Sequence, residues 1–262
     1  MATAGTAPLL AVDGVTLQYR MRGHLVTATW RVSFQVRRSE RLVLLGPSGC
    51  GKSTLLKAVG GYLKPVEGSI TLDGKPVAGP GPDRVLVFQE FDQLLPWKTV
   101  RENVAFGLAA GRGIGRQEAV ERAGEAIRKV HLEKFADAYP HTLSGGMKQR
   151  VAIARCLAMK PEIILMDEPF AALDALTRQR MQDELLELWD QARFTMIFVT
   201  HSIEEALLLG SRIIVLSPHP GQVREVLEVD PLAGPGRLNG ADPEIGERIR
   251  RALFRDAAEY VI

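Results

Sequence analysis

The sequence has 262 residues, of which 46% are hydrophobic and 24% are charged, with a formal net charge of +2. These values are typical of an ordinary globular protein that is long enough to bury a sizeable core. The balanced charge gives no sign of the clustered basic face that nucleic-acid binding needs, so we expect no nucleic-acid partner.

No apolar run approaches the roughly 18 residues that a membrane span needs. Residues 1–13 lack a basic segment followed by an apolar core, so we expect no secretory signal. Cys50 and Cys156 form no disulfide framework and are expected to be free thiols in a reducing cytosol. We therefore expect a cytoplasmic chain that acts at a membrane only through a partner.

The first predicted elements are strands of an antiparallel hairpin between residues 10 and 36, where apolar and polar residues alternate in short runs. Tyr19 ends the first of these runs. It is either an ordinary strand aromatic or a ring that stacks on an adenine. Its position in the chain does not decide between the two.

A glycine loop follows a short apolar strand at residues 41–45 and precedes a helix that opens at residues 55–59. The loop fits G-x-x-x-x-G-K-[ST], a pattern that arises by chance in roughly one chain in a hundred of this length. Its glycines let backbone N–H groups turn inward, and the helix N-terminus adds partial positive charge. Lys52 would reach the β- and γ-phosphates of a nucleotide, and Ser53 would coordinate Mg²⁺. The predicted phosphate cradle comprises Gly46, Pro47, Ser48, Gly49, Cys50, Gly51, Lys52, Ser53 and Thr54.

Strands are predicted next at residues 68–74 and 85–88, the second ending at Gln89. A glutamine there is usually a surface residue, but at the carboxyl end of a parallel strand it points at the ligand crevice. From about residue 90 to residue 160 strand signals vanish and the periodicity becomes helical. We expect an all-helical insertion in an α/β core, with helices at residues 100–110, 116–130 and 145–158.

Ser144, Gly145 and Gly146 stand directly before the last of those helices. They form either a second anion-binding helix N-terminus or a tight cap with only a structural role. The apolar strand at residues 162–167 then ends in Asp167 and Glu168. An acidic pair after a strand is often a solvated turn. Behind a phosphate loop, however, such an Asp holds Mg²⁺, here through its hydration shell, and Glu168 is placed to polarise the attacking water.

His201 follows another strand whose carboxyl end faces the same predicted crevice, although a lone histidine at a strand end is more often structural. A helix is predicted at residues 178–189 and strands at residues 195–200 and 212–217. A loop rich in proline and glycine follows at residues 230–242, and a short amphipathic helix at about residues 243–260.

Over roughly residues 8–230 the sequence resembles the ATP-binding subunits of ABC transporters. The resemblance rests on six motifs that follow in the family's order, namely Gly46–Thr54, Gln89, Leu143–Arg150, Ile163–Glu168, Ala172–Asp174 and Thr200–His201. It implies an α/β fold with a P-loop (RecA-like) ATPase core, an N-terminal antiparallel β region and an inserted α-helical subdomain. The expected ABC ATPase domain spans residues 1–230, with the core at 1–89 and 161–230 and the helical subdomain at about 90–160; residues 231–262 would form a C-terminal loop and short helix.

The resemblance also implies ATP and Mg²⁺ as ligands and a head-to-tail homodimer. Each ATP would lie between the phosphate loop of one subunit and the signature of the other, a twofold arrangement with two composite sites. Ser144, Gly145 and Gly146 would bind the partner's ATP, with Ser144 and Gly146 contacting its γ-phosphate. Tyr19 would stack on adenine, and Asp174 would communicate between the two sites.

For catalysis, the resemblance implies that Glu168 is the general base and that His201 holds the γ-phosphate and the water in place. Gln89 would contact Mg²⁺ and the lytic water, and Lys52 would bind the phosphates. The implied metal set is Ser53, Gln89 and Asp167.

A narrower resemblance is to the nitrate/sulfonate/taurine importer branch, carried by Gly79–Arg84, Val87–Glu90, Leu94–Val100, Glu102–Leu108, Pro169–Asp174 and Pro220–Gly221. It implies a peripheral subunit on the cytoplasmic face of the inner membrane. The partners would be an integral membrane permease and, indirectly, an extracytoplasmic solute-binding protein. The solute would be a small anion such as nitrate, a sulfonate or taurine, or a thiamine-precursor pyrimidine.

Three further features qualify this resemblance. Leu94, Leu95 and Trp97 form either an exposed apolar groove for the permease or part of the subdomain core. Ser202 stands where many family members carry Asp, which removes a carboxylate beside His201. The tail after Asp230 is too short for the regulatory domain of some importer ATPases, so we expect no sugar-type regulatory input.

Two other functions compete with transport. A soluble ABC ATPase of the translation-factor type would need two signature motifs, and a DNA-repair type would need a long coiled coil between phosphate loop and signature. A P-loop kinase would not need Leu143–Arg150. The single, closely spaced motif set therefore favours ATP hydrolysis coupled to transport.

Overall fold

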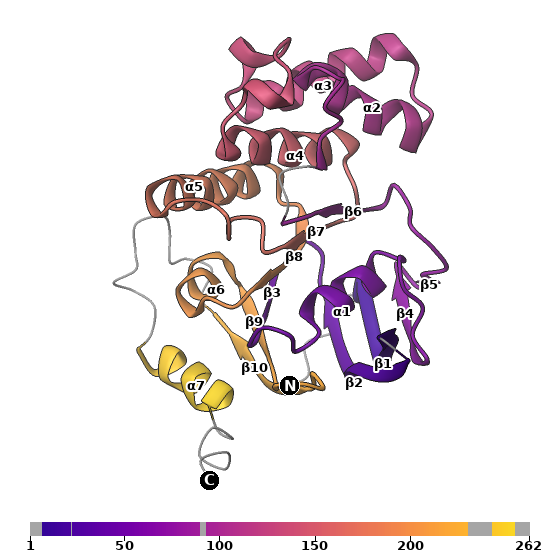
Figure 1. Ribbon diagram of the computed structural model, residues 1–262, viewed down its shortest axis with the longest axis vertical. Helices are drawn as coiled ribbons and strands as arrows, with labels where there is room; N and C mark the ends of the chain where they lie inside the picture. Colours follow the sequence, from indigo (N-terminus) through magenta and orange to yellow (C-terminus); the bar gives the residue numbers. More distant parts are fainter. Residues whose placement is uncertain (1–6, 22, 90–92, 230–242, 255–262) are drawn as a thin grey trace. The chain divides into compact units, whose positions relative to one another are not determined.

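The computed structural model describes residues 7–21, 23–89, 93–229 and 243–254 (Figure 1). By its internal contacts the chain divides into two compact units. The first unit comprises Met1–Pro80 and Phe194–Ile262, and the second comprises Gly81–Arg193.

The first unit contains the predicted N-terminal hairpin. Strands β1 (Leu10–Met21) and β2 (His24–Val36) pair antiparallel, with Leu10 opposite Val36. Strand β4 (Glu67–Leu72) pairs with the other edge of β1, and β5 (Lys75–Pro76) pairs with β4. Buried and exposed residues alternate along the second half of β2, as expected for a sheet with one face on a core. The hairpin prediction is confirmed.

The first unit also contains a mainly parallel set of strands. Strand β3 (Arg41–Leu45) lies between β8 (Thr195–Thr200) and β9 (Arg212–Leu216) and is parallel to both. All residues of β3 and β8 are buried, which explains why these strands read as continuous apolar runs. Strand β10 (Val223–Glu228) pairs antiparallel with β9 and was not predicted, because polar residues interrupt its short sequence.

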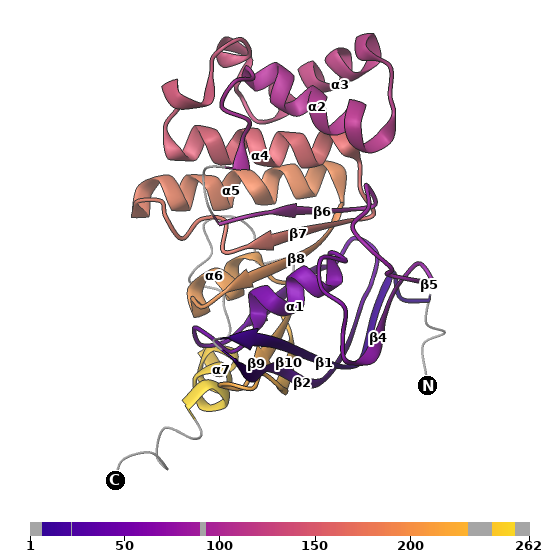
Figure 2. The same ribbon diagram turned by 45° about the vertical axis from the view of Figure 1, so that its right-hand side comes forward.

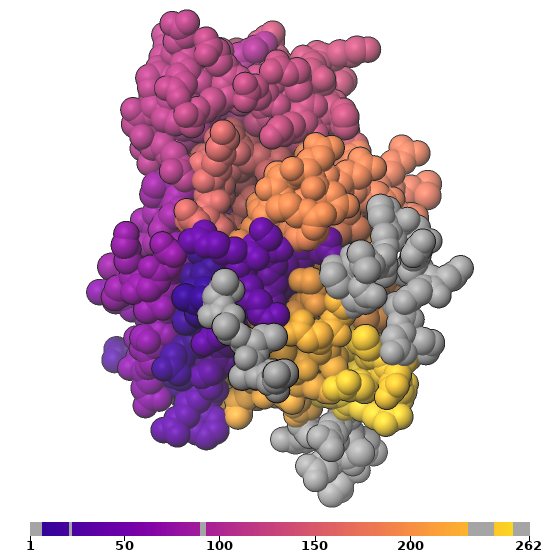
Figure 3. Space-filling model, turned by 180° about the vertical axis from the view of Figure 1, so that it is seen from behind, coloured from indigo at the N-terminus to yellow at the C-terminus, as the bar shows by residue number. Residues whose placement is uncertain are grey.

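Three helices complete the described part of the first unit: α1 (Lys52–Val59), α6 (Ile203–Leu209) and α7 (Pro243–Phe254). Helix α6 was missed by the sequence analysis because its seven residues make less than two clear helical periods. Helix α7 packs against strands β9 and β10 (Figure 3). The Arg224 guanidinium donates to the Ala252 carbonyl at 2.8 Å. The predicted loop 230–242, and the predicted helix beyond residue 254, lie outside the described residues.

The described part of the second unit combines two parallel strands with four α-helices. Strand β6 (Arg84–Val87) pairs with β7 (Ile163–Asp167), and α2, α3 and α4 pack on one another (Figure 2). The predicted strands and helices of this region are confirmed to within a few residues. The helices are α2 (Val100–Arg112), α3 (Arg116–Lys129), α4 (Gly145–Met159) and α5 (Ala175–Ala192), with short 3-10 helices η2 (Glu133–Phe135) and η3 (Pro140–Thr142).

Helix α5 begins earlier than the predicted start at Arg178, because Asp174 caps it. The Asp174 carboxylate accepts a hydrogen bond from the Thr177 N–H at 3.0 Å, which satisfies one of the unpaired donors of the first turn. Hydrogen bonds from Thr177, through its side chain and its backbone, hold the pKa of Asp174 below its ordinary value. The charged form of this carboxylate thus interacts more favourably with the N–H groups at the helix N-terminus than the protonated form does.

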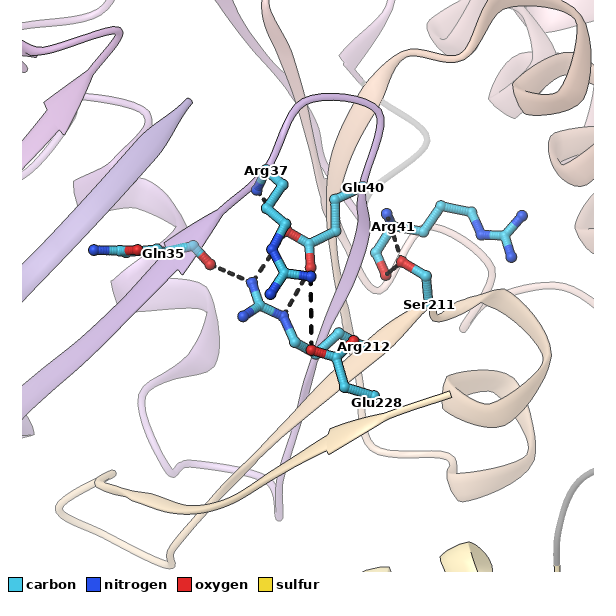
Figure 4. A network of polar contacts seen from close by, with 7 residues as sticks. All are labelled: Gln35, Arg37, Glu40, Arg41, Ser211, Arg212 and Glu228. Carbon is cyan, nitrogen blue, oxygen red and sulfur yellow. Dashed lines mark hydrogen bonds and ion pairs between the residues drawn. The ribbon is translucent and has the colours of Figure 1, made fainter. Parts of the chain in front are cut away.

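A buried ion pair fixes the beginning of β3 to β9 (Figure 4). Arg212 Nε lies 2.7 Å from Glu40 Oε1, and the exposed fractions of the two side chains are 11% and 6%. The Arg37 N–H donates to Glu40 Oε2 at 2.6 Å, and Arg212 also donates to the Gln35 carbonyl. Next to the pair, the Ser211 N–H donates to the Arg41 carbonyl at 2.8 Å. The strand that leads into the glycine loop is therefore anchored at its start.

Within the described ranges, no helix combines the length and the apolar character that crossing a membrane requires.

We predict that Glu40→Gln lowers the free energy of unfolding by about 3 kcal/mol, because it leaves the Arg212 charge buried without its counter-ion. Asp73→Asn is the matched control, since it neutralises the exposed pair of Asp73 with Arg38 at 2.9 Å. We expect the control to cost less than about 1 kcal/mol. Urea unfolding, followed by circular dichroism, measures the free energy of unfolding of both variants. An equal decrease in the two variants would contradict the larger stabilising effect that we assign to the buried pair.

A second prediction concerns the cap of α5. The pKa of Asp174 is lowered by folding, so its stabilising effect is complete above the unfolded value of about 3.9 and is lost as the pH falls through the folded value. We expect the protection factor of the Thr177 amide, corrected for intrinsic exchange, to fall as the pH is lowered through that range. Asp174→Asn keeps an accepting oxygen and should abolish the pH dependence. Amide exchange by NMR measures it, and a pH-independent protection factor in the parent chain would refute the prediction.

Candidate nucleotide-binding site

In the first unit, the glycine loop and His201 lie at the same edge of the sheet. Strands β3 and β8 are parallel neighbours, with Leu45 opposite Thr200. Gly46 and His201 therefore follow adjacent strands at their carboxyl ends, where open α/β sheets bind ligands. The His201 side chain is exposed. The structure thus brings together two elements that the sequence places about 150 residues apart.

The glycine loop is built tightly and has no room for side chains at two of its glycines. Gly51 has φ of 94°, in the left-handed region that favours glycine. A Cβ atom there would lie 2.5 Å from the Ala28 carbonyl oxygen. At Gly46 it would lie 2.8 Å from the Cys50 sulfur. The loop backbone is therefore confined on its inner side by β2 and by the buried Cys50, while Ser48 at its tip is exposed.

Lys52 and the start of α1 supply positive charge to this loop. The Lys52 ammonium donates to the Gly46 carbonyl at 2.7 Å and to the Pro47 carbonyl at 2.9 Å. Lys52 is 4% exposed, and α1 begins at this residue. A lysine charge, a helix N-terminus and an exposed loop tip fit a phosphate group. Ser53 is the next residue of the same turn and offers the hydroxyl that the predicted metal set requires.

Tyr19 lies on β1, opposite Val26, and is 42% exposed. The ring is therefore available for stacking at the surface of the hairpin. Exposure is compatible with adenine binding and with an ordinary surface aromatic, so the two interpretations given by the sequence both stand.

The second unit has its own edge of strand ends with polar residues. Strands β6 and β7 are parallel, with Val87 opposite Met166. Gln89, which is exposed, thus follows the strand next to the one that ends in Asp167 and Glu168. Asp167 is 8% exposed.

Glu168 adopts a left-handed backbone conformation with φ of 43°, and its carbonyl accepts from the Ala171 N–H at 3.1 Å. For a residue other than glycine, this conformation costs on the order of 1–2 kcal/mol. Six other described residues that are not glycine share this conformation, so it does not by itself mark Glu168 as a site residue.

The same unit places the signature beside the start of α5. Ser144 caps α4, since its hydroxyl accepts from the Met147 N–H at 3.3 Å. A Cβ atom at Gly146 would lie 2.9 Å from the Thr177 methyl group, and Thr177 is the residue whose N–H binds Asp174. The structure therefore brings the segment Ser144, Gly145 and Gly146 close to Asp174, as two neighbouring capped helix N-termini.

Ser202, which the sequence analysis treated as a lost carboxylate, caps helix α6. Its hydroxyl accepts from the Glu205 N–H at 3.2 Å, and its own N–H donates to the Thr200 hydroxyl at 3.0 Å. Serine and aspartate are comparable helix caps, so the segment after His201 keeps its local structure. The pKa of Glu204 is lowered, first by its own backbone N–H and then by the Ser202 hydroxyl.

The polar contacts of two residues in the second unit, the buried Asn103 and the partly exposed Arg150, were missed by the sequence analysis. Asn103 is 1% exposed, and its amide nitrogen donates to the carbonyls of Leu95, Lys98 and Thr99. Arg150, at the end of the signature, pairs with Glu184 of α5 at 2.5 Å. Burial raises the pKa of Glu184, and the Arg150 charge opposes that shift. The signal for Asn103 was an asparagine on the apolar face of α2, whereas the pairing of Arg150 has no local signal.

The apolar group Leu94, Leu95 and Trp97 divides between the two predicted roles. Leu94 is 4% exposed and belongs to the core, whereas Trp97 is 70% exposed. Leu95 is partly exposed, and its backbone is held by Asn103. Of the three, only Trp97 projects a large apolar surface to solvent.

Comparisons with known proteins agree with these features. The family described as "ABC transporter" matches residues 30–171, more than half of the chain. The taurine import ATP-binding protein TauB of Rhizobium johnstonii is 49% identical over 254 residues, covering 94% of this chain and 96% of that protein. TauB of Pseudomonas aeruginosa PAO1 is 43% identical over 258 residues, covering 95% and 97%.

Solved structures give the same result. The dimeric structure of MJ0796, a bacterial ABC transporter cassette, is 36% identical, with a TM-score of 0.73, and covers 84% of this chain and 98% of that one. A post-hydrolysis dimer of MJ0796 bound to ADP and Pi is 34% identical, with a TM-score of 0.71 over the same shares. With the glycine loop, the signature and the acidic strand end in place, the chain belongs to the ABC transporter family, as an ATP-hydrolysing subunit of the nitrate/sulfonate/taurine importer branch.

Proposed function

We propose that this chain powers a permease that imports a small sulfonate such as taurine. The observation that carries the proposal is the near full-length match to proteins named as taurine import ATP-binding proteins. That match also disfavours the alternative of a soluble ATPase on ribosomes or DNA. Nitrate and thiamine-precursor pyrimidines are the competing solutes, and no residue of the chain is assigned to contact any of them.

The proposed nucleotide ligands follow from the local chemistry of each segment. The loop from Gly46 to Thr54 would hold the phosphates of ATP through its N–H groups and Lys52. Tyr19 would stack on the adenine. Ser53, Gln89 and Asp167 would hold Mg²⁺, the last through a water molecule. When bound, Mg²⁺ neutralises charge on the β- and γ-phosphates.

The proposed chemistry is the attack of water on the γ-phosphate. Glu168 would accept the proton from the attacking water, and Gln89 would orient that water. His201 would hold the γ-phosphate and the water in place. The position of Glu168, directly after β7 and next to Asp167, supports this role.

We further propose a head-to-tail homodimer with two composite sites related by a twofold axis. The α4 N-terminus, with Ser144, Gly145 and Gly146, would bind the γ-phosphate of the partner's ATP. Support comes from the exposed Ser144 at a helix N-terminus that carries no acidic residue in its first turn. Asp174 would carry the signal between the sites, since it lies beside this N-terminus through Thr177.

The permease contact is proposed at Trp97. The Asn103 amide binds the carbonyls of Leu95, Lys98 and Thr99, which holds the Trp97 backbone in a defined loop. Lys98 Nζ lies 5.7 Å from the centre of the Phe106 ring, and Phe106 is 46% exposed. A large exposed aromatic on a fixed backbone is suited to receive an apolar helix. The subunit would thus be peripheral, on the cytoplasmic face of the inner membrane.

We predict that Glu168→Gln lowers the rate of ATP hydrolysis about 10²–10⁴-fold and leaves ATP binding intact, because only the base is removed. Glu162→Gln is the control, since Glu162 precedes the other end of the same strand, β7, and is exposed. Phosphate release and ATP titration measure the two quantities. Hydrolysis by Glu168→Gln at the parent rate would remove the proposed general base.

We predict that the tagged full chain, purified from gently solubilised native membranes, carries a multi-span permease with it. Trp97→Ala should lose the permease while it retains ATP binding, whereas Phe135→Ala, at another exposed aromatic of the same unit, should keep it. The complex, reconstituted in vesicles with its binding protein, should hydrolyse ATP faster with taurine than with nitrate. Ribosomal or DNA-repair partners without a permease would refute the transport function.

A further inference from the structure

The motif Pro220–Gly221, noted in the sequence but given no role above, lies directly against the glycine loop. A Cβ atom at Gly221 would lie 2.1 Å from the carbonyl oxygen of Cys50. No side chain can occupy that space without displacing the loop backbone or its own. The φ angle of Gly221 lies outside the left-handed region, so the need for glycine here is one of close approach and not of backbone conformation.

Gly221 is also tied to β2 by its backbone. Its N–H donates to the Ala28 carbonyl at 2.9 Å, and its carbonyl accepts from the Trp30 N–H at 3.0 Å. These two bonds form a one-residue parallel bridge with Thr29. The Ala28 carbonyl is the same atom that stands 2.5 Å from a Cβ atom at Gly51. The glycine loop is therefore backed by β2 at Gly51 and by Gly221 at Cys50.

The Ser217 hydroxyl makes several contacts within the segment that carries Gly221, in addition to a backbone bond from the Ser217 N–H to the Gln222 carbonyl at 2.8 Å. Ser217 follows β9 directly, and its hydroxyl accepts from the Gln222 N–H at 2.9 Å. The same oxygen lies 2.9 Å from the Pro218 carbonyl and 3.0 Å from the Pro220 carbonyl. Ser217 is 8% exposed, so these bonds are shielded from water. We call the segment Ser217–Gln222 the brace loop.

We propose that the brace loop positions the glycine loop for ATP and that Gly221 is a positioning residue for nucleotide binding. A phosphate cradle made of backbone N–H groups binds well only if those groups are held in place before the ligand arrives. The brace loop supplies that support from outside the nucleotide-binding motif. The inference rests on the proposed assignment of the Gly46–Thr54 loop to the phosphates of ATP.

Two serines at opposite ends of β9 allow a matched test. Ser217→Ala removes the hydroxyl that shapes the brace loop and introduces no clash. Ser211→Ala removes a hydroxyl that accepts from the Arg41 N–H at 3.1 Å and lies 3.2 Å from the Arg41 carbonyl, at the other end of the strand. Both variants lose partly buried hydrogen bonds of a hydroxyl with backbone groups, so a purely structural role predicts similar behaviour.

The measurement is the dissociation constant of the non-hydrolysable analogue AMP-PNP with Mg²⁺, by titration calorimetry on the full chain below the onset of unfolding. We expect Ser217→Ala to raise it about fivefold and Gly221→Ala to raise it at least about tenfold. Ser211→Ala should stay within about twofold of the parent. Gly210→Ala is the steric control for Gly221→Ala, because its Cβ atom would meet the Ala206 carbonyl at 2.8 Å, away from the glycine loop.

The possible results distinguish a failure of the proposed function from a failure of the inference about the brace loop. If the parent chain binds no nucleotide, the proposed function fails. If the parent binds and Ser217→Ala binds equally well, or if Ser217→Ala and Ser211→Ala are weakened equally, the brace inference is overturned. If Gly221→Ala does not fold, the comparison of Ser217→Ala with Ser211→Ala still tests the inference. A rise in the KM for ATP that exceeds the fall in kcat in Ser217→Ala supports the positioning role.

Discussion

The absence of space behind the glycine loop is the constraint on which the site depends. The geometry of a cradle that offers backbone N–H groups to a phosphate is fixed by what its backbone touches. Here the close neighbours are backbone carbonyls and Gly221, together with the side chains of Thr29 and Cys50. The loop meets β2 at Gly51 and the brace loop at Cys50, while Gly46 stands against the end of β9. Rigid strands on both sides thus define the position of a flexible sequence.

The same logic extends to the far end of β3. This strand is buried along its whole length, and its polar side-chain contacts lie at its beginning. There the pair of Glu40 with Arg212, and the backbone bond from the Ser211 N–H to the Arg41 carbonyl, set its register against β9. A buried ion pair of this kind adds little net stability, but each charge requires its partner, which favours one register over slipped alternatives. The glycine loop thus begins at a defined place because β3 does.

Sequence alone was sufficient where the determining pattern is local. The glycine loop, the buried strands and the helices of the second unit each carry their signal within a dozen residues. Local sequence patterns gave no signal where the structure depends on distant partners. Strand β10 exists because β9 offers an edge, and the Pro220–Gly221 motif has a meaning only once Cys50 lies beside it. Helix α6 begins at the Ser202 cap. In the sequence Ser202 indicates only the loss of a carboxylate, whereas in the structure its hydroxyl accepts a hydrogen bond from the Glu205 N–H.

The functional residues are also distributed in a way that bears on mechanism. The glycine loop, Tyr19 and His201 belong to the first unit, whereas Gln89, Glu168, the signature and Asp174 belong to the second. Neither unit alone holds every residue that the proposed function assigns to ATP.

The proposed permease contact, Trp97, lies in the same unit as Gln89 and the signature, on a loop whose carbonyls are bound by the buried Asn103. The proposed roles separate two tasks. The phosphate loop is confined by close contacts with its backbone, while the proposed permease surface presents one exposed side chain on a fixed support. Solute specificity can then differ between importers without any change in how ATP is held.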